Sequence, residues 1–391
     1  MRILSVHNYY RSPGGEDAVF AAEAALLRGA GHQVTEMTAR NDEIRGGGLG
    51  LAVRALWNRD YATEVADTVR RERIDVVHFH NTVPIVSPAS LRAASQAGAA
   101  VVMTLHNYRM ACPAGTLFRE GSVCEDCVGR SFPWAGVARG CYRDSRLASA
   151  TVGVTNALHR VIGTWRNHVD RFVALTHFAK QKFEAAGIPA AATVVKPNFV
   201  ADPGAGERRP EHALFVGRLA PEKGIRTFLE AAARTPDVRC RVVGDGPLAS
   251  EVERAVQQHP NLTWLGWCGR ERIEQELAGA TCLVFPSQWY EGMPMTMLEA
   301  MAMGVPVAAS RCGAMAEIVA HGRNGLLSAP GDAGELADVI RTLGSDSQLQ
   351  RRLGHAARQD YEARYTPACN LAQLEEIYRQ ACTSSRQRRV A

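Results

Sequence analysis

Two carboxylates, Glu291 and Glu299, stand eight positions apart around the predicted start of a helix. Residues 283–285 are typical of a short buried strand, and Pro294 suits the first turn of the following helix, where its missing N–H costs no hydrogen bond. Residues 292–297 then offer backbone N–H groups without intrahelical acceptors, at the positive end of the helix dipole. A phosphate can bind there, and the carboxylate on each side can accept hydrogen bonds from hydroxyl groups. A nucleotide sugar is a ligand that has phosphates between two sets of hydroxyl groups.

A basic loop supports the phosphate interpretation, since the carboxylate pair alone is also typical of an acidic first helix turn beside a solvated glutamate. A predicted strand ends at Gly217, and Arg218 and Lys223 follow it in the chain. Arg provides a planar fork and Lys a compact charge, so together they can neutralise a diphosphate and stabilise it as it leaves. A second strand ends at the turn 244–247, where ligands of open α/β sheets bind.

These motifs, in this order, resemble the C-terminal half of retaining glycosyltransferases of family 4, which have the GT-B fold. The segments that carry the resemblance are Val216-Gly-Arg-Leu-Ala-Pro-Glu-Lys-Gly224, Gly244-Asp-Gly-Pro247 and the run from Glu291 to Val307. The resemblance covers the first half more loosely, through Gly14 and Gly15 after an opening strand and His106 after a later one. It implies that the Gly-Gly loop approaches the donor diphosphate and that His106 faces the donor sugar.

The resemblance also implies an α/β architecture of two Rossmann-like domains facing a central cleft, with a C-terminal helix that crosses back to the first domain. The length of 391 residues suffices for two domains of ordinary size. We expect an acceptor-binding domain over residues 1–200, joined by the helix at about 365–382, and a donor-binding domain over 211–364. The polar Pro/Gly stretch 197–210 separates them. Residues 387–391 are expected to form a disordered tail.

Composition narrows the class of protein. The apolar content of 46% and charged content of 22% are those of a soluble globular protein. The N-terminus resembles a strand rather than a secretory signal, and no run of apolar residues is long enough to span a bilayer. We therefore expect a cytoplasmic protein with mostly reduced cysteines. Residues 1–200 carry 23 Lys and Arg against 17 Asp and Glu, an excess too small for a nucleic-acid binder but suited to an anionic lipid or lipid-phosphate acceptor.

Two amphipathic segments in the basic half, residues 49–61 and 143–169, are predicted helices. Each combines apolar side chains with arginines, so each is able to lie on a membrane surface, as a peripheral protein on the inner face of the cell membrane would. Packing of the same apolar faces into the core is the alternative.

Four cysteines, Cys112, Cys124, Cys127 and Cys141, fall within thirty residues after His106. Because tetrahedral thiolate coordination needs four sulfurs that a loop can fold around one ion, and Cys-x-x-Cys is a chelating spacing, we expect a structural zinc site. Four free thiols, an iron–sulfur cluster and a regulatory disulfide are the alternatives. No metal is expected to take part in catalysis.

The predicted function is retaining transfer of a sugar from a nucleotide diphosphate sugar to a hydroxyl acceptor, such as a lipid-linked glycan of cell-surface polysaccharide. A sugar-nucleotide epimerase of the same fold, or a non-catalytic nucleotide-sugar-binding partner, are the alternatives. The strand-end residues His78 and His80 are interpreted as structural hydrogen-bonding groups. The predicted catalytic residues are His106, Arg218, Lys223 and Glu291, and the predicted donor-binding residues are Gly14, Gly15, Gly217, Gly244, Gly246, Gly292, Met293, Pro294, Met295, Thr296, Met297 and Glu299.

Overall fold

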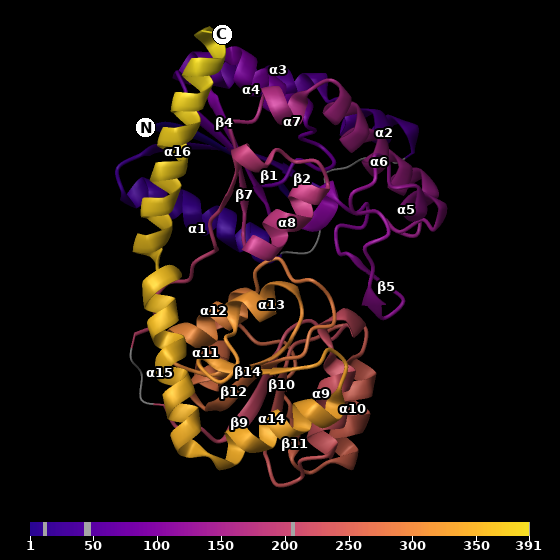
Figure 1. Cartoon of the computed structure of the whole chain (residues 1–391), viewed down its shortest axis with the longest axis vertical. Coiled ribbons are helices and arrows are strands. Elements are labelled where there is room, and N and C mark those ends of the chain that lie inside the picture. The colour runs from indigo at the N-terminus through magenta and orange to yellow at the C-terminus, as the bar shows by residue number, and fades with distance from the viewer. Residues whose placement is uncertain (11–13, 43–47, 205–207, 391) are drawn as a thin grey trace. The chain divides into compact units, whose positions relative to one another are not determined.

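The computed structural model describes residues 1–10, 14–42, 48–204 and 208–390, and the chain divides into two compact units (Figure 1). Unit 1 comprises Met1–Leu117, Glu125–Asn198 and Asn370–Ala391, and unit 2 comprises Phe118–Cys124 and Phe199–Cys369. Residues 205–207 of the predicted linker lie outside the described residues.

Unit 1 is built on a six-stranded parallel sheet in the order β2-β1-β3-β4-β7-β8. Its inner strands β3 and β4 are buried at every position, as expected of a parallel sheet covered by helices on both faces, whereas the edge strand β2 is mostly exposed or half-buried. The register places Ile3 opposite Val76 and Val76 opposite Ala100, so the carboxyl ends of β1, β3 and β4 meet at one edge. The strands are β1 (Arg2–Tyr9), β2 (Gln33–Arg40), β3 (Val76–Phe79), β4 (Ala100–Leu105), β7 (Arg171–Ala174) and β8 (Thr193–Val195).

The core of unit 1 joins the first and last helices of the chain to this sheet. Leu27 of α1 and Leu374, Ile377 and Tyr378 of α16 pack in one cluster with Ile3 and other sheet residues. The helices of unit 1 are α1 (Gly15–Gly29), α2 (Leu49–Leu56), α3 (Arg59–Glu72), α4 (Ala89–Ala97), α5 (Trp134–Ala138), α6 (Arg146–Val161), α7 (Thr164–Asn167), α8 (His177–Ala185) and α16 (Pro367–Val390), with short 3-10 turns η1 (Tyr108–Met110) and η2 (Ala190–Ala192).

Unit 2 repeats the architecture with a parallel sheet in the order β11-β10-β9-β12-β13-β14. Its strands are β9 (His212–Val216), β10 (Cys240–Val243), β11 (Leu262–Trp264), β12 (Ala280–Phe285), β13 (Val307–Ser310) and β14 (Gly325–Ser328). Its helices are α9 (Ile225–Ala233), α10 (Ala249–Gln258), α11 (Arg270–Ala278), α12 (Met295–Ala302), α13 (Gly313–Ile318), α14 (Ala333–Ser345) and α15 (Ser347–Arg364), with the turn η3 (Pro221–Lys223) and the small hairpin β5 (Phe118–Arg119) and β6 (Ser122–Val123).

Both predicted amphipathic helices are shorter than their apolar patterns indicated. The segment 49–61 is divided between α2 and α3, because the Asn58 side chain accepts a hydrogen bond from the Tyr61 N–H and so caps a new helix. The segment 143–169 is divided between α6 and α7 at Gly163, whose φ of 73° is left-handed. The spacing of the apolar residues continues across each break, so the apolar pattern alone does not predict where the first helix ends.

The predicted disordered tail was also wrong over the described residues, since α16 continues to Val390. Arg388 forms an ion pair with the buried Asp170 at 3.1 Å, and Arg389 donates a hydrogen bond to the Gly98 carbonyl oxygen. These contacts fix the last turns of α16 to unit 1. Among the helices that the structure describes, none is both long and apolar enough to cross a bilayer.

Candidate active site

The predicted site residues of unit 2 lie where three neighbouring strands end. β9 ends before Gly217, β10 ends before Gly244, and β12 ends before the loop 286–294. Because β10, β9 and β12 are adjacent in a parallel sheet, their three loops meet at one edge, the usual place for a ligand of an α/β fold.

Glycines let these loops approach one another at backbone distance. A Cβ would lie 1.9 Å from the Gly217 carbonyl oxygen if added to Gly244, 2.6 Å from that of Leu219 if added to Gly246, and 1.9 Å from that of Pro286 if added to Gly224. The φ angles of Gly224 and Gly244, 69° and 137°, would also strain any other residue. Both glycines of the turn 244–247 are therefore needed to pack the edge where the predicted ligand lies.

Lys223 and Glu291 come from separate motifs and form an ion pair in the structure. The Lys223 Nζ atom lies 2.8 Å from Glu291 Oε1, and the Ser287 hydroxyl donates to the same oxygen at 2.7 Å. The ammonium group also lies 5.2 Å from the centre of the Trp289 ring, within cation–π range. The structure thus brings a predicted cation and a predicted carboxylate together and holds each in one orientation.

Arg218 differs from Lys223 because its side chain is exposed. Within the described parts of the chain, its guanidinium group makes no hydrogen bond or ion pair. It is therefore available to an anion, although a basic surface loop has the same features.

The helix predicted after Pro294 is α12, which begins at Met295. Met293 and Met297 are buried, so their side chains anchor the first turn. The Met297 N–H already donates to the Pro294 carbonyl oxygen at 3.2 Å, so the phosphate-binding candidates are the other N–H groups of this turn. Glu299, half-buried in α12, has its pKa raised by burial, and the charge of Arg270 at the start of α11 opposes that shift. Arg270 lies 29 positions before Glu299 in the chain, so no local pattern in the sequence indicates that the two are neighbours.

Gly14 and Gly15 lie at the start of α1, after β1. The Gly14 N–H donates to Asp17 Oδ2 at 2.8 Å, and Asp17 Oδ1 lies 2.7 Å from Nε2 of the buried His7. Gly14 has an extended conformation, and a Cβ added to it would meet no atom of the described residues within 4 Å. The fold of unit 1 therefore gives no reason for a glycine at position 14.

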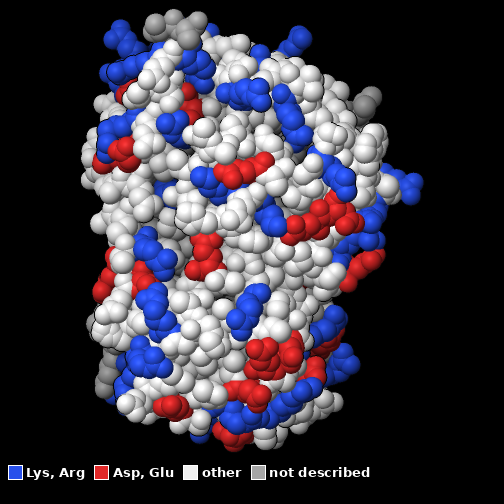
Figure 2. All heavy atoms as spheres, viewed as in Figure 1, with Lys and Arg blue, Asp and Glu red and all other residues white. Residues whose placement is uncertain are grey.

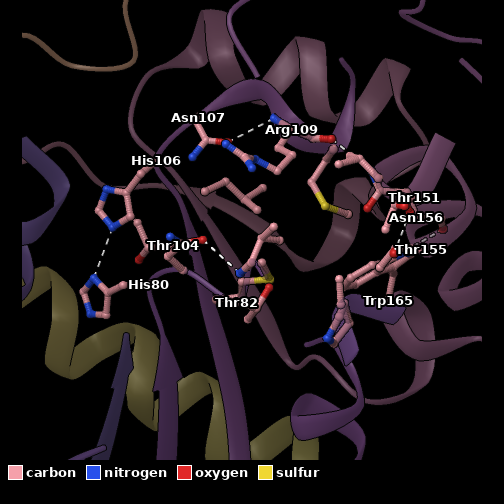
Figure 3. Close-up of a pocket in the computed structure, with 18 residues that line it drawn as sticks. His80, Thr82, Thr104, His106, Asn107, Arg109, Thr151, Thr155, Asn156 and Trp165 are labelled. Atoms are coloured by element: carbon pink, nitrogen blue, oxygen red, sulfur yellow. Dashed lines mark hydrogen bonds between the residues drawn. The ribbon is translucent and has the colours of Figure 1, made fainter. Parts of the chain in front are cut away.

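His106 follows β4 and lines a cavity of about 50 Å³ in unit 1 (Figure 3). Its Nε2 atom lies 3.1 Å from His80 Nδ1, and the two rings are stacked at 5.3 Å between centroids. Burial lowers the pKa of His106 to about 3, so the imidazole is neutral at pH 7. His78, one strand position before the end of β3, bonds Tyr378 and Thr104, as expected of a structural histidine.

Two family models match consecutive parts of the chain. The "Glycosyl transferase 4-like domain" matches residues 14–198, and "Glycosyl transferases group 1" matches residues 203–360. The chain belongs to the GT-B glycosyltransferases of family 4 type. The predicted family is thus confirmed, and so is the predicted α/β fold class of two domains, each built on a parallel sheet.

Relatives and solved structures agree with this assignment. This family 4 chain is 33% identical over 225 residues to an exopolysaccharide phosphotransferase of Streptomyces coelicolor, covering 54% of this chain and 23% of that protein. It is 28% identical over 218 residues to alpha-D-kanosaminyltransferase of Streptomyces kanamyceticus, covering 54% and 55%. The Anabaena HepE protein, crystallised with UDP, shares the fold with a TM-score of 0.67 at 19% identity, over 96% of this chain and 99% of that one. The chain thus spans about half or less of the length of these two curated relatives.

A half-buried polar group beside His106 was not predicted from the sequence. The Asn107 amide donates to the Tyr10 hydroxyl at 3.2 Å and to Glu16 Oε2 at 3.4 Å, and Arg109 lies over the Tyr142 ring at 4.9 Å. Burial raises the pKa of Glu16 to about 7, against the hydrogen bond from Tyr10 and the charge of Arg109. Asn107 and Arg109 follow a strand end directly, so their positions were the available signal.

The cysteines differ in their surroundings. Cys112, Cys124, Cys127 and Cys141 are half-buried. Cys124 lies next to the short strand β6, whereas Cys127 and Cys141 flank α5. Zinc coordination by the four sulfurs stays a prediction. Of the scattered cysteines, Cys240, Cys282 and Cys312 are buried core residues.

Proposed function

We propose that this chain transfers a sugar from a nucleotide diphosphate sugar to a hydroxyl group of an acceptor, with retention of the anomeric configuration. The observation that carries the proposal is the pairing of Lys223 with Glu291 at the sheet edge where α/β folds bind ligands, with the exposed Arg218 in the same loop as Lys223. Two cations and a carboxylate meet the needs of a diphosphate attached to a sugar, since the phosphate requires positive charge and the sugar offers hydroxyl donors.

The proposed reaction breaks the bond between the sugar C1 and the diphosphate oxygen and forms a bond from C1 to the acceptor oxygen. The electron pair leaves with the diphosphate, where Arg218 and Lys223 stabilise the developing negative charge. The family resemblance implies that the acceptor adds on the face from which the diphosphate leaves, and that the leaving phosphate takes the acceptor proton. Glu291 accepts hydrogen bonds from the donor sugar.

Glu299 accepts hydrogen bonds from the ribose hydroxyls in the proposed complex, because its carboxylate is half-buried at the helix that also provides the phosphate-binding N–H groups. Uracil is the base we would test first, since HepE was crystallised with UDP. A close approach of the ligand to this loop is supported by Gly14, because no atom of the described residues lies within 4 Å of the place that its side chain would take.

The test of this function is sugar transfer measured from UDP-glucose and a panel of other nucleotide sugars by release of the nucleoside diphosphate. Arg218→Ala and Lys223→Ala should each lower kcat by about a hundredfold, since removing one charged donor from a developing anion costs roughly 3 kcal/mol. Arg226→Ala is the matched control, because Arg226 is an exposed arginine of α9 that pairs with Glu251. Near-normal turnover of either variant at saturating donor would show that the diphosphate is held elsewhere.

The acceptor in this proposal is lipid-linked, and the support comes from an apolar surface on unit 1. Leu147, Val154 and Val161 are 54%, 41% and 85% exposed, and their seven-residue spacing puts them in one stripe along α6. Val53 and Trp57 at α2 and Trp134 of α5 are also exposed. We call these six residues the apolar surface of unit 1.

A cavity of about 290 Å³ lies between α2 and α6 and is lined mainly by apolar side chains, among them Leu51, Ala55, Leu147 and Val152. Ala55 and Val152 also line the cavity that contains His106. A hydrocarbon chain bound between α2 and α6 would therefore lead toward the residue that is proposed to face the sugar.

The charge near the apolar surface suits an anionic lipid. Residues 130–169 contain six arginines and one acidic residue, Asp144, and α6 has no acidic residue. Figure 2 shows basic side chains prevailing over the visible face of unit 1, whereas both signs mix over unit 2. Each Lys or Arg near an anionic membrane contributes about 1 kcal/mol to binding.

Vesicle cosedimentation tests this part of the proposal. The protein should bind vesicles that contain phosphatidylglycerol and bind pure phosphatidylcholine weakly, and the double variant Val154→Glu, Val161→Glu should lose about tenfold or more in affinity. Trp267→Glu is the control, because Trp267 is 77% exposed but belongs to unit 2. Equal binding of both variants, or no binding of the unaltered protein, would contradict a lipid-binding surface.

A further inference from the structure

His106 has a defined partner on one side of its ring and no partner on the other. Its Nε2 atom is 3.1 Å from His80 Nδ1, as the dashed line in Figure 3 marks, while its Nδ1 atom makes no hydrogen bond within the described residues. Burial keeps the pKa of His80 well below its ordinary value, as it does for His106. Two neutral imidazoles therefore share a single proton across this contact, and either ring could be the donor.

Glu23 decides which ring donates. Its Oε2 atom lies 3.7 Å from His80 Nε2, and each of these two buried atoms has no hydrogen-bond partner among the described residues. Burial alone would raise the pKa of Glu23, but the ammonium group of Lys196, 2.5 Å from Oε1, holds it below its ordinary value. Glu23 is therefore a carboxylate.

A bare His80 Nε2 would direct its lone pair at this negative charge, whereas a protonated Nε2 is attracted to it. The proton consequently lies on His80 Nε2, and His80 Nδ1 is the acceptor. His106 must then donate through Nε2–H, which leaves its Nδ1 atom as a bare acceptor.

We propose that His80 is a positioning residue that holds His106 in the Nε2–H tautomer, so that His106 Nδ1 accepts a hydrogen bond from a hydroxyl group of the sugar substrate. The assignment of the sugar rests on the proposed function, whereas the tautomer rests on the contacts of unit 1 alone. Glu23 and Lys196 act one step further away, by fixing the proton on His80.

A metal ion bound by Glu23, His78 and His80 is the competing use of the same atoms, which lie within 4.8 Å of one another. Two contacts argue against it. Lys196 already supplies a positive charge 2.5 Å from Glu23, and both ring nitrogens of His78 are engaged with Tyr378 and Thr104. A second cation would be repelled by the first and would have to break those hydrogen bonds.

The tautomer is measured directly by long-range ¹H–¹⁵N correlation spectra of the full chain labelled at histidine nitrogens, with the His106 signals assigned by their loss in His106→Gln. The unaltered protein should show the Nε2–H tautomer for His106. His80→Asn should retain it, because the Asn side-chain oxygen can occupy the place of Nδ1 and accept the same hydrogen bond. His80→Leu should give a mixture of tautomers or the Nδ1–H form.

His78→Leu is the matched control, since His78 is also buried, two positions earlier in the chain, and its two ring nitrogens bond Tyr378 and Thr104 rather than His106. It should leave the His106 tautomer unchanged. If His80→Leu does not fold, the spectrum of the unaltered protein still decides, because an Nδ1–H tautomer there overturns the proposal. Bound zinc or another metal at His80 would overturn it as well.

Kinetics separate this inference from the proposed function. With UDP-glucose as the probe donor, His80→Leu should lower kcat by about tenfold with little change in KM, and His80→Asn should restore most of kcat, because one well-oriented hydrogen bond is worth about 1.4 kcal/mol. An Nε2–H tautomer in a protein that transfers no sugar would refute the function and not the tautomer. An active protein in which His80→Leu keeps normal kcat would refute the positioning role.

Discussion

The ion pair between Glu23 and Lys196 gives a stability prediction that follows from burial. Glu23 lies on α1, Lys196 follows β8, and their side chains are 3% and 1% exposed. Lys196→Met removes the cation and leaves a buried carboxylate that faces His80, at 3.7 Å, without a hydrogen bond to it. The variant should therefore lose much more stability than the removal of an exposed lysine would cost.

The magnitude is about 3–5 kcal/mol, the cost of breaking a buried pair by removing one partner. A domain is stabilised by roughly 5–15 kcal/mol in total, so unit 1 would become marginal. The double variant Glu23→Gln, Lys196→Met removes both charges and should recover most of the loss, because a buried pair often contributes little beyond what neutral residues of similar volume provide.

Hydrogen exchange followed by mass spectrometry measures the effect in each unit separately. Peptides of β1 and β4 should exchange faster in Lys196→Met, whereas peptides of β12 in unit 2 should not change. Lys180→Met is the matched control, because Lys180 pairs with Glu184 at 3.8 Å with both side chains 30% exposed, and it should cost less than about 1 kcal/mol. If Lys196→Met were no more damaging than this control, or if the double variant stayed as unstable as the single one, the reasoning from burial would be wrong.

Three further predictions concern binding, pH and metal content. Glu299→Gln should weaken the binding of both UDP and UDP-glucose in calorimetry. Glu291→Gln should leave the affinity for UDP unchanged and impair sugar transfer. If both variants changed the affinities for the two ligands equally, Glu299 would not be specific to the ribose or Glu291 to the sugar. Because burial raises the pKa of Glu16 from 4.5 to about 7, the folded protein binds that proton more tightly than the unfolded chain does, so stability is lost as the pH rises from 4.5 through about 7. Glu16→Gln should flatten Tm against pH in this window. Metal analysis should find about one equivalent of zinc. Cys124→Ser should make residues 112–141 less ordered and leave the affinity for UDP unchanged. A metal-free protein with normal sugar transfer would refute the zinc site.

The family and the two-sheet fold could be predicted because their signals are local. A strand that ends at Gly217 followed by Arg218, or a Pro before an apolar helix, depends on a few consecutive residues. The contact between Lys223 and Glu291 joins residues 68 positions apart. The sequence named both residues but not the pair, because pairing depends on which strands are neighbours.

The rest of the site depends on which side chains are buried together, and a pattern of a few consecutive residues does not predict that. In the sequence Glu16 is an ordinary acidic residue at a helix start, and its raised pKa comes from burial beside Tyr10 and Asn107. His80 was interpreted as structural because a strand-end histidine is usually so, and its distances to His106 and Glu23 are what distinguish it from His78. Helix ends at Asn58 and Gly163 were missed for the opposite reason, since one capping residue overrides a pattern that continues past it.

The division of unit 1 into separate stretches of chain constrains the order in which the protein can fold during synthesis. The segment 199–369, which supplies both the sheet and the helices of unit 2, is complete before residues 370–390 have been made. Until then His78 lacks the Tyr378 hydroxyl, and the face of the first sheet lacks Leu374 and Ile377. The second unit should therefore mature first on the ribosome, although it is encoded later. A fragment ending at residue 198 would expose that uncovered face and aggregate, whereas supplying α16 as a separate peptide should restore it.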